Sequence, residues 1–141
     1  NDGRHLAVRN GKDDLALLRP RAGDFVQQSF VEAGAAIVSG PLDDQPTASC
    51  SADICVADVE ADGHRLRIMA TRSPYLVDRR ALGAVCRSVD MVVSDRRLPV
   101  GCKPRWLRAD RSLLARTGGL AISLSPFSLR TSRRARDDHP W

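Results

Sequence analysis

Aromatic residues are scarce in this chain of 141 residues, at 4% of the sequence against an apolar share of 43%. The core must therefore be built from leucine, valine, isoleucine and alanine. Long apolar runs are also absent. The longest candidates, residues 35–38 and 120–124, are strand-sized and fall far short of the ~20 residues that span a bilayer. The chain begins without an initiator Met or a signal peptide, so we expect a fragment or a processed form.

Residues that commonly carry catalysis are few and scattered. The three histidines, His5, His64 and His139, lack the i+2 or i+4 partner of a hydrolytic metal site. Ser94 has no neighbouring histidine base and no Gly-x-Ser-x-Gly elbow. Glycine pairs such as Gly118-Gly119 are too sparse for a phosphate-binding loop. The sequence thus offers no catalytic residue, metal site or cofactor site. It favours a binding function over an enzymatic one.

Lysine is nearly absent: 20 of the 22 basic residues are arginine. The charge is also divided unevenly, since residues 1–63 carry 5 basic and 11 acidic residues, whereas residues 64–141 carry 17 basic and 6 acidic residues. A segment with so large a positive net charge attracts nucleic acid or anionic lipid. An arginine-rich, alanine-rich surface is equally typical of a GC-rich genome, so charge alone leaves both interpretations open.

Turn signals and hydrophobic periodicity predict hairpins and short helices. Asn10-Gly11 separates strands at 5–8 and 15–18, and Asp62-Gly63 separates strands at 54–60 and 64–70. We expect Asp24, Asp78 and Asp110 to cap three short helices, the first ending at Gly34 and the last at Gly118. Residues 39–51 have the composition of a loop, and further strands are expected at 91–94, 120–124 and 128–132.

These elements predict an α/β or mixed α+β fold, with β-hairpins, a small sheet and about three short helices. The chain length fits one globular domain, which we place at residues 1–135, with residues 136–141 as a flexible tail.

A basic loop is expected between the strand that starts at Met91 and the helix that Asp110 caps. It surrounds one tryptophan with cations, and such a loop at the carboxyl end of a strand is a common ligand site in α/β proteins. Cations with an aromatic ring suit an anionic polymer. The candidate DNA-binding residues are Arg96, Arg97, Lys103, Arg105, Trp106, Arg108 and Arg111. Trp106 is either a stacking platform for a base or the lid of a small apolar cluster with Pro104 and Leu107.

The four cysteines lie at positions 50, 55, 86 and 102. They show neither the Cys-x2-Cys pairs nor the neighbouring histidines of a zinc site. Two interpretations remain: disulfides Cys50–Cys55 and Cys86–Cys102, or four thiols in a reducing compartment. We favour the sequential pairing because each pair would clamp a local loop beside regular structure. Two such bonds would place the chain outside the cytosol.

Three segments carry a family resemblance. Residues 2–9 (DGRHLAVR), 15–26 (LALLRPRAGDFV) and 92–122 (VVSDRRLPVGCKPRWLRADRSLLARTGGLAI), with the terminal HPW, resemble the C-terminal soluble region of ComEC-type competence proteins. The resemblance implies a domain of a polytopic channel that admits single-stranded DNA during natural transformation. It also implies a location on the periplasmic face of the bacterial inner membrane.

In many members of that family, this region is similar to a metallo-β-lactamase and is held to degrade the strand that does not enter. The His-x-His-x-Asp-His motif has no counterpart here, so the resemblance implies a reduced, metal-free lobe and no nuclease residues. We expect a non-catalytic domain that contacts incoming DNA through its basic loop. One alternative is an assembly domain that docks on its own transmembrane portion or on anionic lipid headgroups. Another is a residual hydrolase with a metal site that cannot be recognised from the spacing of residues in the sequence.

Overall fold

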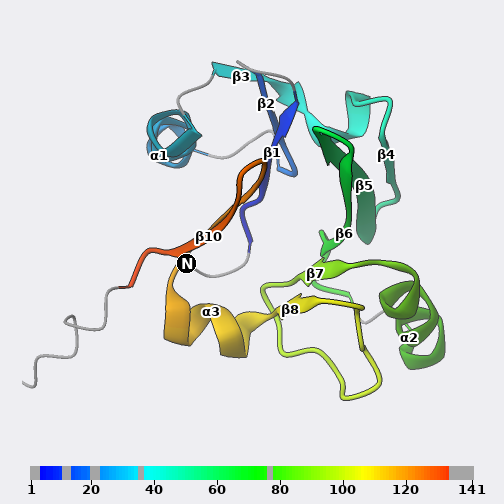
Figure 1. The fold of residues 1–141 in the computed structure, drawn as a ribbon. Helices are drawn as coiled ribbons and strands as arrows, with labels where there is room; N and C mark the ends of the chain where they lie inside the picture. Colours follow the sequence, from blue (N-terminus) through cyan, green and yellow to red (C-terminus); the bar gives the residue numbers. More distant parts are fainter. Residues whose placement is uncertain (1–3, 11–13, 20–22, 35–36, 76–77, 134–141) are drawn as a thin grey trace, which may run out of the picture.

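The computed structural model describes residues 4–10, 14–19, 23–34, 37–75 and 78–133. In these ranges it contains three α-helices, one 3-10 helix and ten β-strands, which form three small sheets (Figure 1). The mixed α+β class predicted from the sequence is thereby confirmed, including the small sheet and the three short helices. Among the described residues, no helix has both the length and the apolar character needed to cross a membrane.

A five-stranded sheet forms the centre of the structure, in the order β4-β5-β6-β7-β8. Its strands are β4 (Ala48–Cys50), β5 (Ile54–Ala61), β6 (His64–Thr71), β7 (Met91–Val93) and β8 (Leu107–Ala109). β4, β5 and β6 pair antiparallel, whereas β6, β7 and β8 are parallel. Helix α2 (Arg79–Ser88) connects β6 to β7, and residues 94–106 connect β7 to β8. We call the side where β6, β7 and β8 end the carboxyl edge.

Side chains on neighbouring positions of these strands point to opposite faces, so the sheet is packed on both sides. One face carries α2 and the β7–β8 connection, and its buried cluster is Met69, Leu82, Cys86, Val89, Val92 and Cys102. The opposite face holds the larger cluster, which includes Ala57, Ile68, Ala70, Met91, Val93 and Ala109. Burial on both faces explains why β7 is apolar throughout instead of alternating.

Smaller elements cover the face with the larger cluster. They are the sheet of β1 (Ala7–Asn10), β2 (Asp14–Leu17) and β3 (Ile37–Pro41), the helix α3 (Arg111–Thr117), and the hairpin of β9 (Leu120–Leu124) and β10 (Phe127–Thr131). Val8, Leu114 and Ile122 bring β1, α3 and β9 into that cluster. Helix α1 (Asp24–Gly34) lies beside the β1–β3 sheet (Figure 1).

Two of the three predicted helix caps are confirmed. The carboxylate of Asp78 accepts hydrogen bonds from the amides of Arg80 and Ala81, and that of Asp110 accepts them from Ser112 and Leu113. At α1 the prediction was one residue off: Asp24 is the first helical residue, and the carbonyl of Gly23 accepts from Val26. Phe25, in the first turn of α1, is 81% exposed.

The loop prediction for residues 39–51 was wrong, because that segment contains the end of β3, a 3-10 turn (Leu42–Asp44) and β4. β3 holds a glycine and a proline, which are tolerated because it is an edge strand paired only with β2. β8 was also missed. It is three residues long, and Leu107 and Ala109 face the core while Arg108 points outward.

Both cysteine pairs expected from the sequence are at disulfide distance. Cys50 and Cys55 are cross-strand neighbours in the β4–β5 pair. Cys86 on α2 is bonded to Cys102 in the β7–β8 connection. The described chain contains no free cysteine. Two disulfides are consistent with a location outside the cytosol.

Candidate functional site

The β7–β8 connection (residues 94–106), which carries most of the predicted site, is held firmly to the sheet and to α2. The hydroxyl groups of the buried Ser94 and Thr71 are hydrogen-bonded at 2.9 Å, and the Ser94 amide donates to the carbonyl of Ala109. At the other end the amide of Arg105 donates to the carbonyl of Val89. Ser94, considered above as a nucleophile, is fully buried and serves as a hydrogen-bonding anchor.

Two further contacts hold the middle of this connection. The Cys86–Cys102 disulfide ties it to α2. Gly83 of α2 lies so close to the connection that an added Cβ would be 3.4 Å from the carbonyl oxygen of Gly101. A ligand would therefore meet a preformed surface rather than an unstructured loop, which lowers the entropic cost of binding.

The seven predicted DNA-binding residues are divided between opposite edges of the sheet. Arg96 and Arg97 follow β7 and Arg111 follows β8, and the amide of Arg111 donates to the carbonyl of Arg96 at 3.2 Å, so these three share the carboxyl edge. Lys103, Arg105 and Trp106 precede β8 and lie at the opposite edge, beside the start of β7. Arg108 lies within β8, between the two groups.

The cations also differ in what they already bind. Nη1 of Arg96 donates to the carbonyl oxygens of Pro74 and Tyr75, at 3.2 and 2.7 Å. Arg105 is paired with Asp90 at 3.3 Å, and Arg108 with Asp110 at 3.4 Å. These three side chains are thus partly committed to holding the fold.

Three of the predicted cations remain uncommitted. The side chains of Arg97, Lys103 and Arg111 are exposed, and they form no ion pair or hydrogen bond within the described ranges. Helix α2 adds Arg79, Arg80 and Arg87, which are also exposed and without such a partner among the described residues. Arg79 and Arg80 lie in the first turn of α2, the helix that follows β6 in the chain.

Trp106 packs edge-on against Phe127 of β10, with ring centroids 5.7 Å apart and an interplanar angle of 66°. Phe127 was not anticipated from the sequence as a partner of Trp106. Trp106 is 42% exposed, so part of its ring is open to solvent.

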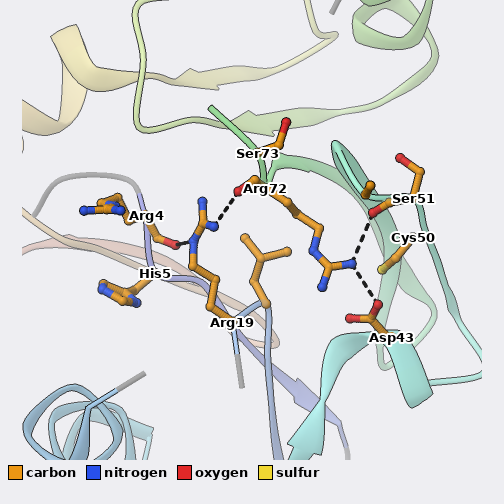
Figure 2. A pocket seen from close by; sticks show the side chains of 10 residues that line it. Arg4, His5, Arg19, Asp43, Cys50, Ser51, Arg72 and Ser73 are labelled. Atoms are coloured by element: carbon orange, nitrogen blue, oxygen red, sulfur yellow. Dashed lines mark hydrogen bonds and ion pairs between the residues drawn. The ribbon is translucent and has the colours of Figure 1, made fainter. Parts of the chain in front are cut away.

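A second basic feature, missed in the sequence analysis, lies next to the carboxyl edge. It is an open hollow of about 860 Å³, lined among others by Arg4, His5, Arg19, Asp43, Arg72 and Ser73 (Figure 2). Its residues come from the segment before β1, the residues after β2, the 3-10 turn, the end of β4 with the turn that follows it, and the residues after β6. No local motif could have identified the hollow, because the fold brings together one to three residues from each of five separate segments.

The strongest electrostatic network lies on β5 and β6, away from the carboxyl edge and from the hollow. Asp58 accepts hydrogen bonds from Arg65 and Arg67, the latter at 2.9 Å. These bonds, first that from Arg65 and then that from Arg67, lower the pKa of the Asp58 carboxyl, and the same contact raises the pKa of Arg65. The network is a structural one, since all three residues are occupied with one another.

Groups of three or more histidine, cysteine or acidic side chains with metal-binding geometry are not found in the described part of the chain. Comparisons with protein-family models, with curated proteins and with solved structures find no match to this chain.

Proposed function

We propose that this chain is a non-catalytic, extracytoplasmic domain of a DNA-uptake channel, and that it contacts single-stranded DNA through its carboxyl edge. The observation that carries the proposal is the pair of exposed arginines there, Arg97 and Arg111, whose segments are joined by the hydrogen bond from the Arg111 amide to the carbonyl of Arg96. No acidic partner within the described residues neutralises them. Cations of this kind attract the phosphate backbone whatever its sequence.

The resemblance to ComEC-type proteins supplies the biological setting of the proposal. In that setting the domain lies on the periplasmic face of the inner membrane and is joined to a transmembrane portion of the same polypeptide. The two disulfides support an oxidising compartment. The proposal places Lys103, Arg105 and Trp106, at the opposite edge, outside the main path of the DNA.

Docking is the second candidate function, and the exposed side chain of Val100 favours it. Val100 is 81% exposed in the β7–β8 connection, with the cations Arg97 and Lys103 on either side of it in sequence. An apolar side chain among cations suits a surface of anionic lipid headgroups or a basic-face contact with the transmembrane portion. A domain with this function would bind anionic vesicles and would show no preference for single-stranded DNA.

The test is fluorescence anisotropy of a labelled single-stranded oligonucleotide, at several salt concentrations, with the chain in its oxidised form. A duplex of equal length runs alongside. We expect binding that favours the single strand and weakens as salt rises, with each neutralised phosphate contributing about −0.7 to the slope of log affinity against log salt. Reversing two charges, R97E with R111E, should weaken binding at least tenfold and make the slope shallower by about 1.4.

A matched control variant, R116E with R130E, changes the net charge by the same amount. Arg116 lies in the last turn of α3 and Arg130 lies on β10, both are exposed, and neither belongs to the carboxyl edge. If the control weakens binding as much as R97E with R111E, general charge explains the affinity and the carboxyl edge is not the site. Binding to anionic vesicles without any oligonucleotide binding would replace the proposal with the docking function.

A further inference from the structure

The open hollow beside the carboxyl edge brings the side chains of Arg19 and Arg72 to one surface. Its volume of about 860 Å³ lies within the usual range of small-molecule sites, roughly 300 to 1,000 Å³. Phe, Tyr and Trp are missing from the described residues that line it, so it offers no platform for stacking an aromatic ring. Recognition there must rely on charge and hydrogen bonds.

Arg19 is the central feature of the hollow. Its Nε donates to the carbonyl oxygen of Arg4 at 2.7 Å, and its Nη1 donates to the carbonyl oxygen of Arg72 (Figure 2). Carbonyl oxygens fix the plane of a guanidinium group but do not cancel its charge. Within the described ranges Arg19 has no carboxylate partner. It is therefore a positioned and unneutralised cation.

Arg72 supplies a second guanidinium group. Its Nη1 binds Asp43 at 2.7 Å and the carbonyl oxygen of Ser51 at 3.2 Å. Its Nε and Nη2, like Nη2 of Arg19, are bonded to no described residue. The hydroxyl groups of Ser51 and Ser73 are already bonded, to Ile54 and to Asp53. The donors left for a ligand are thus mainly guanidinium N–H groups, which match tetrahedral oxyanions.

We infer that this hollow is a phosphate-binding site, in which Arg19 and Arg72 hold the anion. The ligand is a phosphate group, either of a polynucleotide backbone or of a free phosphate or mononucleotide. As a step in DNA handling, the inference rests on the proposed function. Arg72 and Ser73 directly follow β6, so the hollow continues the basic carboxyl edge, and one strand could occupy both.

The first test is a ¹H–¹⁵N NMR titration of the oxidised 141-residue chain with inorganic phosphate, at ionic strength held constant with chloride. We expect saturable shifts at the backbone amides of Arg19, Ser51 and Ser73 and at Nε of Arg19. The R19Q variant should raise the dissociation constant at least tenfold, the R19K variant should lie between R19Q and the native chain, and the control R116Q should change nothing. The native titration needs no variant, so it decides the question even if R19Q fails to fold. Absence of saturable shifts at these residues would overturn the inference.

A second test separates the two sources of phosphate. Thymidine 5′-monophosphate and oligothymidylate are added in turn to the phosphate-bound chain. Displacement of phosphate by oligothymidylate at lower concentration supports a site for the DNA backbone. Displacement by the mononucleotide alone supports a site for a free phosphate ligand. That conclusion remains valid even if no DNA binding is found. If the chain does not bind inorganic phosphate and R19Q leaves oligonucleotide binding unchanged, the inference of a phosphate site in the hollow is overturned. The carboxyl edge would then remain as the DNA site.

Discussion

At the scale of single residues, Asp58 shows how one carboxylate stabilises the fold. It lies on β5, its side chain is 15% exposed, and it accepts hydrogen bonds from two arginines of the neighbouring strand β6. These bonds favour the charged form of Asp58 and so lower its pKa below the usual value of 3.8. Because the folded-state pKa lies below the unfolded one, the contribution is complete above the unfolded pKa. It is lost as the pH falls through the folded pKa.

The D58N variant tests this contribution. At pH 7 we expect a loss of about 1 kcal/mol in the free energy of unfolding, as for a partly screened ion pair. Below pH 4 the native chain should lose its advantage progressively, so that the two proteins converge. Urea unfolding of both proteins between pH 7 and pH 2 measures the difference. A gap that stays constant over this range would mean that hydrogen bonding or packing, and not the charge of Asp58, causes the effect.

Residue types at the candidate site were predictable from the sequence, but their roles were not. The basic run was evident, yet nothing in it distinguishes Arg96, which binds the carbonyl oxygens of Pro74 and Tyr75, from Arg97, which is exposed. That difference depends on the position of the segment after β6, which is set by tertiary packing. Arg19 and Arg72 were not considered at all, because they are 53 positions apart and meet only in the fold.

At the scale of elements, those with strong local signals were predictable and those that depend on a partner were not. The Asp62-Gly63 turn predicted the β5–β6 hairpin, and both residues have positive φ there, 48° and 78°. β4 and β8 are three residues long and are defined by their pairing with β5 and β7. A strand this short has too few residues to show a period of two in its apolar residues, so it cannot be predicted from the sequence.

Asp110 is an element-scale feature because one side chain joins three segments. Its Oδ1 caps α3, while its Oδ2 accepts from the amide of Leu98 at 3.3 Å and lies 3.4 Å from Nε of Arg108. The residue is 3% exposed, so water does not readily replace these bonds. Loss of its carboxylate would therefore affect both α3 and the β7–β8 connection.

The D110A variant should lose about 2 to 3 kcal/mol in the free energy of unfolding, since a cap is lost and a part-buried amide loses its acceptor. The control is D78A, which removes the cap of α2 at an exposed position and should cost about 1 kcal/mol. Chemical denaturation of both variants gives the comparison. Equal losses would show that Asp110 acts only as a helix cap.

At the scale of the whole molecule, the two disulfides should contribute unequally. Cys86 and Cys102 are separated by 16 positions, and Cys50 and Cys55 by 5. The stabilisation that comes from restricting the unfolded chain grows with loop length, to about 3 kcal/mol for the longer loop and about 2 kcal/mol for the shorter one. The longer loop also joins α2 to the β7–β8 connection, so its bond fixes two of the segments that carry the exposed cations.

The paired variants C86A with C102A and C50A with C55A separate these effects. We expect the C86A with C102A variant to be the less stable of the two by about 1 kcal/mol in urea unfolding.

We also expect the C86A with C102A variant to bind the oligonucleotide more weakly, because α2 and the β7–β8 connection must then be ordered on binding. The second pair should keep its affinity for DNA at the carboxyl edge, but it should bind inorganic phosphate more weakly, since Cys50 and Ser51 line the hollow. If both pairs lowered stability and neither changed binding, the disulfides would stabilise the fold without organising either site. Weaker DNA binding in the first pair alone would instead show that the Cys86–Cys102 bond holds the cationic surface in place.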